Sequence, residues 1–195
     1  MGVDQWLAAE IIAVVLNIGS TICIAMENRI AWLLGFVAAC ISVALYKHNA
    51  AWAMTGLNVF YAIMGLYGWW SWGRNKDGQR IQRRSLRFHL GIIAAGIGIT
   101  AVLAWTLHRY VDGVYPHMDA FITVFSFAAT WMMAHRLLEN WIYWTVGDLV
   151  AVYFNHLLGL EWYALLNVFY IVLSVAGFWR WNRAYRAQQM PPPIA

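Results

Sequence analysis

The chain has 195 residues, of which 62% are hydrophobic and only 11% are charged. Soluble domains are about 45–50% apolar and about 25% charged, so this composition excludes an ordinary soluble domain and favours an integral membrane protein. The net charge of +4 does not indicate nucleic-acid binding, because the basic residues cluster between long apolar segments.

Seven apolar segments of nearly bilayer length follow one another along the chain. The first contains Glu10 and is preceded by Asp4 where a signal peptide would carry Lys or Arg, so we expect it to be retained. The pattern predicts an all-α membrane protein. Its expected transmembrane helices cover residues 6–26, 30–46, 50–72, 88–107, 118–134, 141–158 and 162–181.

The two halves of the chain carry similar motifs. Glu27 and Asn28 precede Trp32 much as Glu139 and Asn140 precede Trp144, an offset of 112 residues (139 − 27). Residues 58–61 (NVFY) recur at 167–170 with an offset of 109, so this alignment loses three residues between the two blocks. We therefore expect two triple-helix repeats joined by one linker helix, a 3+1+3 parallel arrangement.

These repeats define the expected domain organisation. Residues 1–73 form the first repeat, residues 74–117 hold a basic loop and the linker helix, residues 118–183 form the second repeat, and residues 184–195 form a tail. Because Lys and Arg favour the cytoplasmic side, we expect the N-terminus outside and the C-terminus in the cytoplasm. That orientation places 11 basic residues inside and only Lys47 and Arg109 outside.

Asp148 is the most informative polar residue, because it lies in the middle of the sixth segment. A carboxylate at the bilayer centre costs about 2.5–3.5 kcal/mol, so it must face water, a ligand or a satisfying neighbour helix. Helical periodicity places Trp144 and Asn155 on the same face as Asp148. With an offset of 112, Asp148 corresponds to Phe36 and Asn155 to Val43, which predicts a binding site of unequal halves.

Other candidates occur as pairs in the two halves. Asn58 and Tyr61 correspond to Asn167 and Tyr170, and these side chains either contact a ligand or fasten one helix to another. Trp32 is predicted to enter the cavity together with Trp144. The other tryptophans near basic segments are expected to form an interfacial belt: Trp69, Trp70, Trp72, Trp179 and Trp181.

No chemistry of an enzyme is visible. The two cysteines and six histidines show no metal-ligand spacing, and no nucleotide-binding or nucleophile motif is present. We therefore expect no catalytic residues, no metal and no cofactor. An intramembrane enzyme or a membrane anchor is disfavoured, since acidic groups are few and an anchor does not need matched polar residues.

The order of helices, the segment from Glu139 to Asp148 and the repeated G-x-W-x-W endings resemble the PnuC family of bacterial vitamin transporters. The resemblance spans nearly the whole chain and implies a fold similar to that of SWEET sugar carriers. It also implies a multi-pass protein of the bacterial inner membrane and a homotrimer with a substrate path in each protomer.

The resemblance implies uptake of nicotinamide riboside, a precursor of NAD, by facilitated diffusion. A cytosolic kinase then traps the vitamin by phosphorylation. It also implies a central site of Trp, Tyr, Asn and one acidic residue, which corresponds here to Trp144, Asp148, Asn155, Asn167, Tyr170, Trp32, Asn58 and Tyr61.

The substrate within the family stays open. Many members have a Tyr-x-Lys-Gly stretch where this chain has Tyr153 to His156. Thiamine is the nearest alternative because it is also cationic and aromatic. Riboflavin and sugars come next, although a sugar carrier would not need Asp148. A phosphorylated substrate is disfavoured because no predicted helix has an interior Arg or Lys to bind a phosphate.

Overall fold

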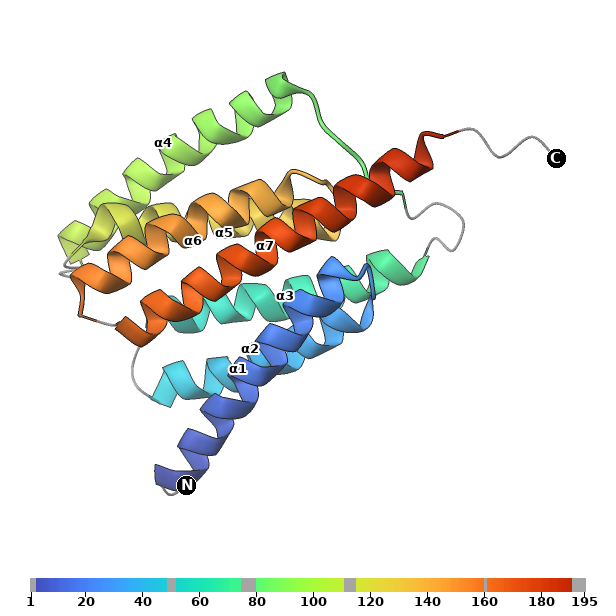
Figure 1. Ribbon diagram of the computed structural model, residues 1–195. Helices are drawn as coiled ribbons and strands as arrows, with labels where there is room; N and C mark the ends of the chain where they lie inside the picture. The colour runs from blue at the N-terminus through green and yellow to red at the C-terminus, as the bar shows by residue number, and fades with distance from the viewer. Residues whose placement is uncertain (1–2, 49–51, 75–79, 111–114, 160, 191–195) are drawn as a thin grey trace. The chain divides into compact units, whose positions relative to one another are not determined.

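The computed structural model describes residues 3–48, 52–74, 80–110, 115–159 and 161–190, and this part of the chain folds into seven helices (Figure 1). The predicted all-α fold with seven helices is confirmed. The helices are α1 (Val3–Ala25), α2 (Ile30–His48), α3 (Trp52–Arg74), α4 (Leu86–Tyr110), α5 (Pro116–Ala134), α6 (Asn140–Leu157) and α7 (Glu161–Gln188).

The helix bounds agree closely with the apolar segments, except at the end of α7. That helix runs on to Gln188 and so includes Arg183 and Arg186, which the sequence placed near or in a tail. Among the described residues, three helices combine the length and apolarity needed to cross a membrane, in Ala8–Ala25, Leu86–Tyr110 and Tyr163–Gln188, and Ile30–Leu45 is a shorter apolar helix. Residues 191–195 of the expected tail lie outside the described residues.

The chain divides into two compact units, residues 1–79 (unit 1) and residues 80–195 (unit 2). In unit 1, α2 packs against both α1 and α3. In unit 2, α6 packs against both α5 and α7, and α4 packs against α5. Gly96 lets α4 approach α5 closely, because a Cβ atom there would lie 2.8 Å from the Phe125 ring. The linker helix therefore belongs structurally with the second triple-helix group.

The same tryptophan packing occurs in each unit. In unit 1, the Trp32 ring lies against Gly68 and meets Trp72 edge to face, with centroids 5.6 Å apart. In unit 2, the Trp141 ring lies against Gly177 and meets Trp181 edge to face, with centroids 5.5 Å apart. The three pairs of equivalent residues share one offset of 109 (141 − 32, 177 − 68 and 181 − 72).

The turns that precede these tryptophans are also 109 residues apart. Glu27 after α1 has φ 59°, and Arg136 after α5 has φ 54°, a left-handed conformation that non-glycine residues adopt rarely. Both residues end a helix in the manner of a left-handed C-terminal cap. Their separation is again 109 (136 − 27). Equal backbone turns and equal ring packing thus give the same alignment of the two units.

This alignment corrects the one predicted from the Glu-Asn motifs. The structural counterpart of Trp32 is Trp141 and not Trp144, and no residues are lost between the blocks. Asp148 then corresponds to Ala39 instead of Phe36 (148 − 109), and both positions are buried. The Glu-Asn motifs gave a wrong alignment because the second motif lies three residues later relative to its helix, at the start of α6.

The predicted tryptophan belt is wrong for two of its five members. Trp72 is 1% exposed and Trp181 is 0% exposed, because each packs against the tryptophan of the preceding helix. Trp70 and Trp179 are well exposed, as belt residues should be. Within the motif G-x-W-x-W, the first tryptophan therefore faces outward and the second faces the helix partner.

Candidate functional site

Asp148 lies in the middle of the eighteen-residue helix α6, and the residue is only 9% exposed. Because α6 packs between α5 and α7, its residues are surrounded by protein on two sides. No hydrogen bond or ion pair reaches the Asp148 carboxylate from the described part of the chain. A buried carboxylate without such a partner is costly, which makes Asp148 a candidate for binding a cation.

Two neighbours give this carboxylate a defined setting. The Tyr170 hydroxyl group on α7 is near enough to interact electrostatically with Asp148. Gly147 is buried, yet a Cβ atom built on it would meet no atom of a more distant residue within 4 Å. The backbone beside Asp148 therefore borders space that other described residues do not fill. A carboxylate, a phenol and adjoining free space are what a small polar ligand requires.

The other predicted residues of α6 extend the same face. Trp144 lies one helical turn before Asp148, and its ring is half-buried. Its indole N–H is buried and has no hydrogen-bond acceptor among the described residues. Asn155 lies two turns beyond Asp148 and is partly exposed. Trp144, Asp148 and Asn155 thus present a ring, a carboxylate and an amide along one helix.

Asn167 is engaged within its own helix. Its side-chain Nδ2 donates a hydrogen bond to the Tyr163 carbonyl oxygen one turn earlier, at 2.7 Å. The amide oxygen of Asn167 still points away from that bond, since Nδ2 and Oδ1 are opposite ends of the group. Tyr170 lies one turn after Asn167 on α7. Asn167 is therefore close along the helix to the tyrosine that neighbours Asp148.

The three predicted site residues of unit 1 have different surroundings. Trp32 is buried against Gly68 and Trp72, which is a helix-packing contact. Asn58 is buried, and Tyr61 lies beside Phe60 with ring centroids 5.9 Å apart. Within unit 1, Ala39 occupies the position equivalent to Asp148. The acidic group of the site is therefore a property of unit 2.

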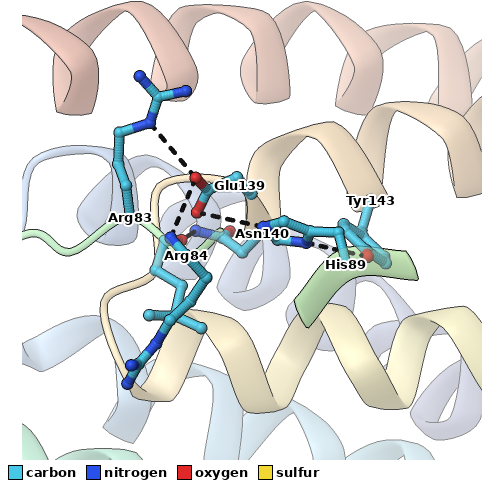
Figure 2. A network of polar contacts seen from close by, with 7 residues as sticks. Arg83, Arg84, His89, Glu139, Asn140 and Tyr143 are labelled. Carbon is cyan, nitrogen blue, oxygen red and sulfur yellow. Dashed lines mark hydrogen bonds and ion pairs between the residues drawn. The ribbon is translucent and has the colours of Figure 1, made fainter. Parts of the chain in front are cut away.

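A second polar cluster surrounds Glu139, the residue before α6 (Figure 2). Its Oε1 accepts hydrogen bonds from Arg83 Nε at 3.3 Å and from the Arg84 backbone N–H at 3.4 Å. Its Oε2 lies 3.9 Å from His89 Nε2. The other ring nitrogen of His89 lies 3.1 Å from the Tyr143 hydroxyl. Glu139 thereby connects the 80–85 segment, the start of α4 and the start of α6.

Backbone pairing holds the same segment in place. Gln82 N–H donates to the Arg136 carbonyl at 3.0 Å, and Leu138 N–H donates to the Gln82 carbonyl at 2.9 Å. Asn140 is fully buried and its Nδ2 donates to the Leu137 carbonyl at 2.6 Å. The α5–α6 corner is therefore fixed by the segment that precedes α4, and with it the start of the helix that carries Asp148.

The sequence pointed to Asp148 but missed the Glu139 cluster and Gly147. Glu139 was visible only as part of a repeated motif, and nothing local marks His89 or Tyr143 as its neighbours. The sequence feature that could have indicated the cluster is the opposite charge of Glu139 and of the arginines 55 and 56 residues before it. Gly147 carried no signal, because unfilled space beside a backbone depends on the packing of other helices.

Comparisons of sequence and structure find known transporters that are similar to this chain. A curated relative, the riboflavin/roseoflavin transporter RibM of Streptomyces davaonensis, is 27% identical over 195 aligned residues, covering 85% of this chain and 91% of RibM. The crystal structure of the vitamin B3 transporter PnuC matches 92% of this chain and 82% of its own, with a TM-score of 0.74 at 19% identity. That structure supports the same seven-helix fold. The family pattern described as nicotinamide mononucleotide transporter matches residues 7–183. The chain is therefore a membrane transporter of the nicotinamide mononucleotide transporter family, the family that contains PnuC.

Proposed function

We propose that this transporter carries nicotinamide riboside, a flat cationic vitamin, across the bacterial inner membrane. The observation that carries the proposal is the buried Asp148 carboxylate, which lacks an ion-pair partner among the described residues and borders unfilled space at Gly147. A cationic pyridinium ring would neutralise this charge. Buried charges persist in proteins when a partner compensates them.

The neighbouring groups suit the other parts of this substrate. The Trp144 ring one turn away offers an aromatic face, and a desolvated cation–π contact contributes about 2 kcal/mol. Tyr170 and the amides of Asn155 and Asn167 offer hydrogen bonds to ribose hydroxyls. Micromolar binding requires about −8 kcal/mol, which one ring contact, one charge pair and a few hydrogen bonds can supply. The contribution of Trp32, Asn58 and Tyr61 stays a prediction.

A phosphorylated form of the vitamin fits this site poorly. Along α6 and α7, the first Lys or Arg side chain is Arg180, which lies 32 residues beyond Asp148 near the end of α7 (180 − 148). A phosphate beside Asp148 would face a like charge and lack a cationic partner. We therefore favour the riboside over the mononucleotide. Facilitated diffusion followed by phosphorylation in the cytosol, with the C-terminus on that side, is the matching mode of uptake, and a homotrimer is the expected assembly.

Riboflavin is a second candidate, because the curated relative RibM is a riboflavin/roseoflavin transporter. Riboflavin is neutral, so it would use the aromatic face without needing the Asp148 charge. Thiamine is a third candidate because it also carries a cationic aromatic ring. The two chemical classes, cationic and neutral, therefore differ in their dependence on one carboxylate.

Isothermal titration calorimetry of the detergent-purified protein tests the proposal directly. The ligands are nicotinamide riboside, thiamine, riboflavin and nicotinamide mononucleotide, each titrated into the same preparation. We expect the riboside to bind at least tenfold more tightly than riboflavin and the mononucleotide. Tightest binding of riboflavin would reject the cationic substrate and establish the second candidate. Tightest binding of thiamine would support a cationic substrate but would identify thiamine, and not nicotinamide riboside, as the vitamin.

A further inference from the structure

Unit 2 carries a concentrated basic surface at one end of α4 and α7. Its members come from the segment before and within the first turn of α4 and from the last turns of α7, and all are exposed. Neither residues 80–90 nor residues 178–190 contain Asp or Glu. We define the arginine surface as Arg80, Arg83, Arg84, Arg87, Arg180, Arg183 and Arg186.

One contact shows that these two segments lie side by side. The Arg83 guanidinium lies 5.9 Å from the centroid of the Tyr185 ring on α7, while its Nε lies 3.3 Å from Glu139 Oε1. Figure 2 shows Arg83 and Arg84 leaving the backbone in different directions, with Glu139 between their attachment points and the start of α6. The segment that carries Arg83 therefore lies beside the end of α7 that carries Arg180, Arg183 and Arg186.

The backbone that presents these charges is held in place. The hydrogen bonds of Gln82 with Arg136 and Leu138 join the loop to the α5–α6 corner. Among the described residues, Glu139 is the one carboxylate that forms an ion pair with an arginine of this surface. It is buried and accepts hydrogen bonds from Arg83 and from the Arg84 backbone. The other six arginines form no ion pair with a carboxylate of the described residues, so the surface has a large excess of positive charge.

Large apolar side chains stand directly beside the charges. Leu86 is 73% exposed next to Arg87, and Trp179 is 74% exposed next to Arg180. Both belong to helices that are long and apolar enough to cross a membrane. A ligand that covers this surface must therefore offer acidic groups and hydrocarbon together. A phospholipid with an anionic headgroup has both, whereas a nucleic acid or a free phosphate offers only the acidic part.

We propose that the arginine surface binds anionic phospholipids of the membrane leaflet that it faces, with the guanidinium groups on lipid phosphates and with Leu86 and Trp179 against the acyl chains and glycerol region. Arginine suits this role because its planar guanidinium forms paired hydrogen bonds with phosphate oxygens. In unit 1, Arg29 lies over the Trp69 ring at 4.0 Å and Arg74 lies over the Trp70 ring at 5.0 Å.

The test compares thermal unfolding of the full-length protein in a neutral detergent with added phosphatidylglycerol or phosphatidylcholine of the same acyl chains. We expect phosphatidylglycerol to raise the unfolding temperature by about 3 °C or more, since a ligand that binds the folded state stabilises it. Phosphatidylcholine should have less than half that effect. High salt should reduce the difference, because the attraction is electrostatic.

The double variant Arg180→Gln with Arg183→Gln is expected to lose at least half of the shift caused by phosphatidylglycerol. Neither residue belongs to the Glu139 cluster, and both are exposed. The matched control is Lys47→Gln with Arg109→Gln, which removes the same charge from α2 and the far end of α4 and should keep the full shift. The proposal is overturned by equal shifts with the two lipids, by an unchanged shift in the arginine variant, or by an equal loss in the control. An equal shift with inorganic phosphate or an oligonucleotide would also overturn it.

Discussion

Trp141 and Trp181 meet edge to face in unit 2, with ring centroids 5.5 Å apart and ring planes at 88°. Both rings are buried, and the Trp141 ring also covers Gly177 on α7. This contact joins the start of α6 to the end of α7 and so fixes the two helices that carry Asp148 and Tyr170. Its counterpart in unit 1 joins Trp32, Gly68 and Trp72 in the same way.

Gly177→Ala should therefore weaken the packing of α6 on α7. The added Cβ would lie 2.6 Å from the Trp141 ring, and large buried rings shift only at a cost. We expect a loss of about 1–3 kcal/mol of folding free energy, measured as a lower unfolding temperature in detergent. Gly98→Ala is the control, because a Cβ there meets nothing within 4 Å and should leave the temperature unchanged or raise it. Equal behaviour of the two variants would contradict the packing role of Gly177.

Asp148→Asn keeps the size of the side chain and removes its charge. If the carboxylate binds a cationic vitamin, affinity for nicotinamide riboside should fall at least about tenfold, which corresponds to about 1.4 kcal/mol. Riboflavin binding should change little, because that ligand is neutral. Glu161→Gln controls for charge, since Glu161 is exposed at the start of α7 and pairs with His156. An unchanged affinity of Asp148→Asn for the riboside, measured by calorimetry, would remove Asp148 from the site.

Gly147→Leu tests whether the space beside Asp148 holds the substrate. A side chain at this buried position meets no distant atom within 4 Å at its Cβ, so the helix should tolerate it. We expect vitamin uptake into proteoliposomes to fall by at least about tenfold because the ligand is displaced. The unfolding temperature should stay within about 2 °C of the unmodified protein. Normal uptake by a well-folded Gly147→Leu variant would show that the substrate passes elsewhere.

The two Glu–His pairs of unit 2 should differ in their contribution to stability. Glu139 is buried and accepts hydrogen bonds from Arg83 and from the Arg84 backbone, so Glu139→Ala should cost about 1–3 kcal/mol. Glu161 and His156 are 2.8 Å apart but exposed, so Glu161→Ala should cost less than about 1 kcal/mol. Chemical unfolding of both variants compares them directly. A larger loss for Glu161→Ala would mean that the Glu139 cluster does not hold the start of α6.

The sequence by itself determined the number of helices, their approximate bounds and the acidic residue in the middle of α6. These properties are local, because a run of apolar residues of bilayer length must satisfy its backbone hydrogen bonds within a helix. The same local rule made Asp148 conspicuous, since charge is costly wherever such a segment is buried. Family membership followed from the same residues and is confirmed by the match over residues 7–183.

Only the tertiary structure decided how the two halves correspond. Trp141 and Trp144 are three residues apart on α6, and the sequence alone favoured Trp144 as the partner of Trp32. The packing of Trp141 on Gly177 and Trp181 reverses that choice, because the face that a helix turns to its neighbour depends on residues more than 30 positions away. The Glu139–His89 approach and the space at Gly147 have the same origin, since both arise between segments that are distant in the chain.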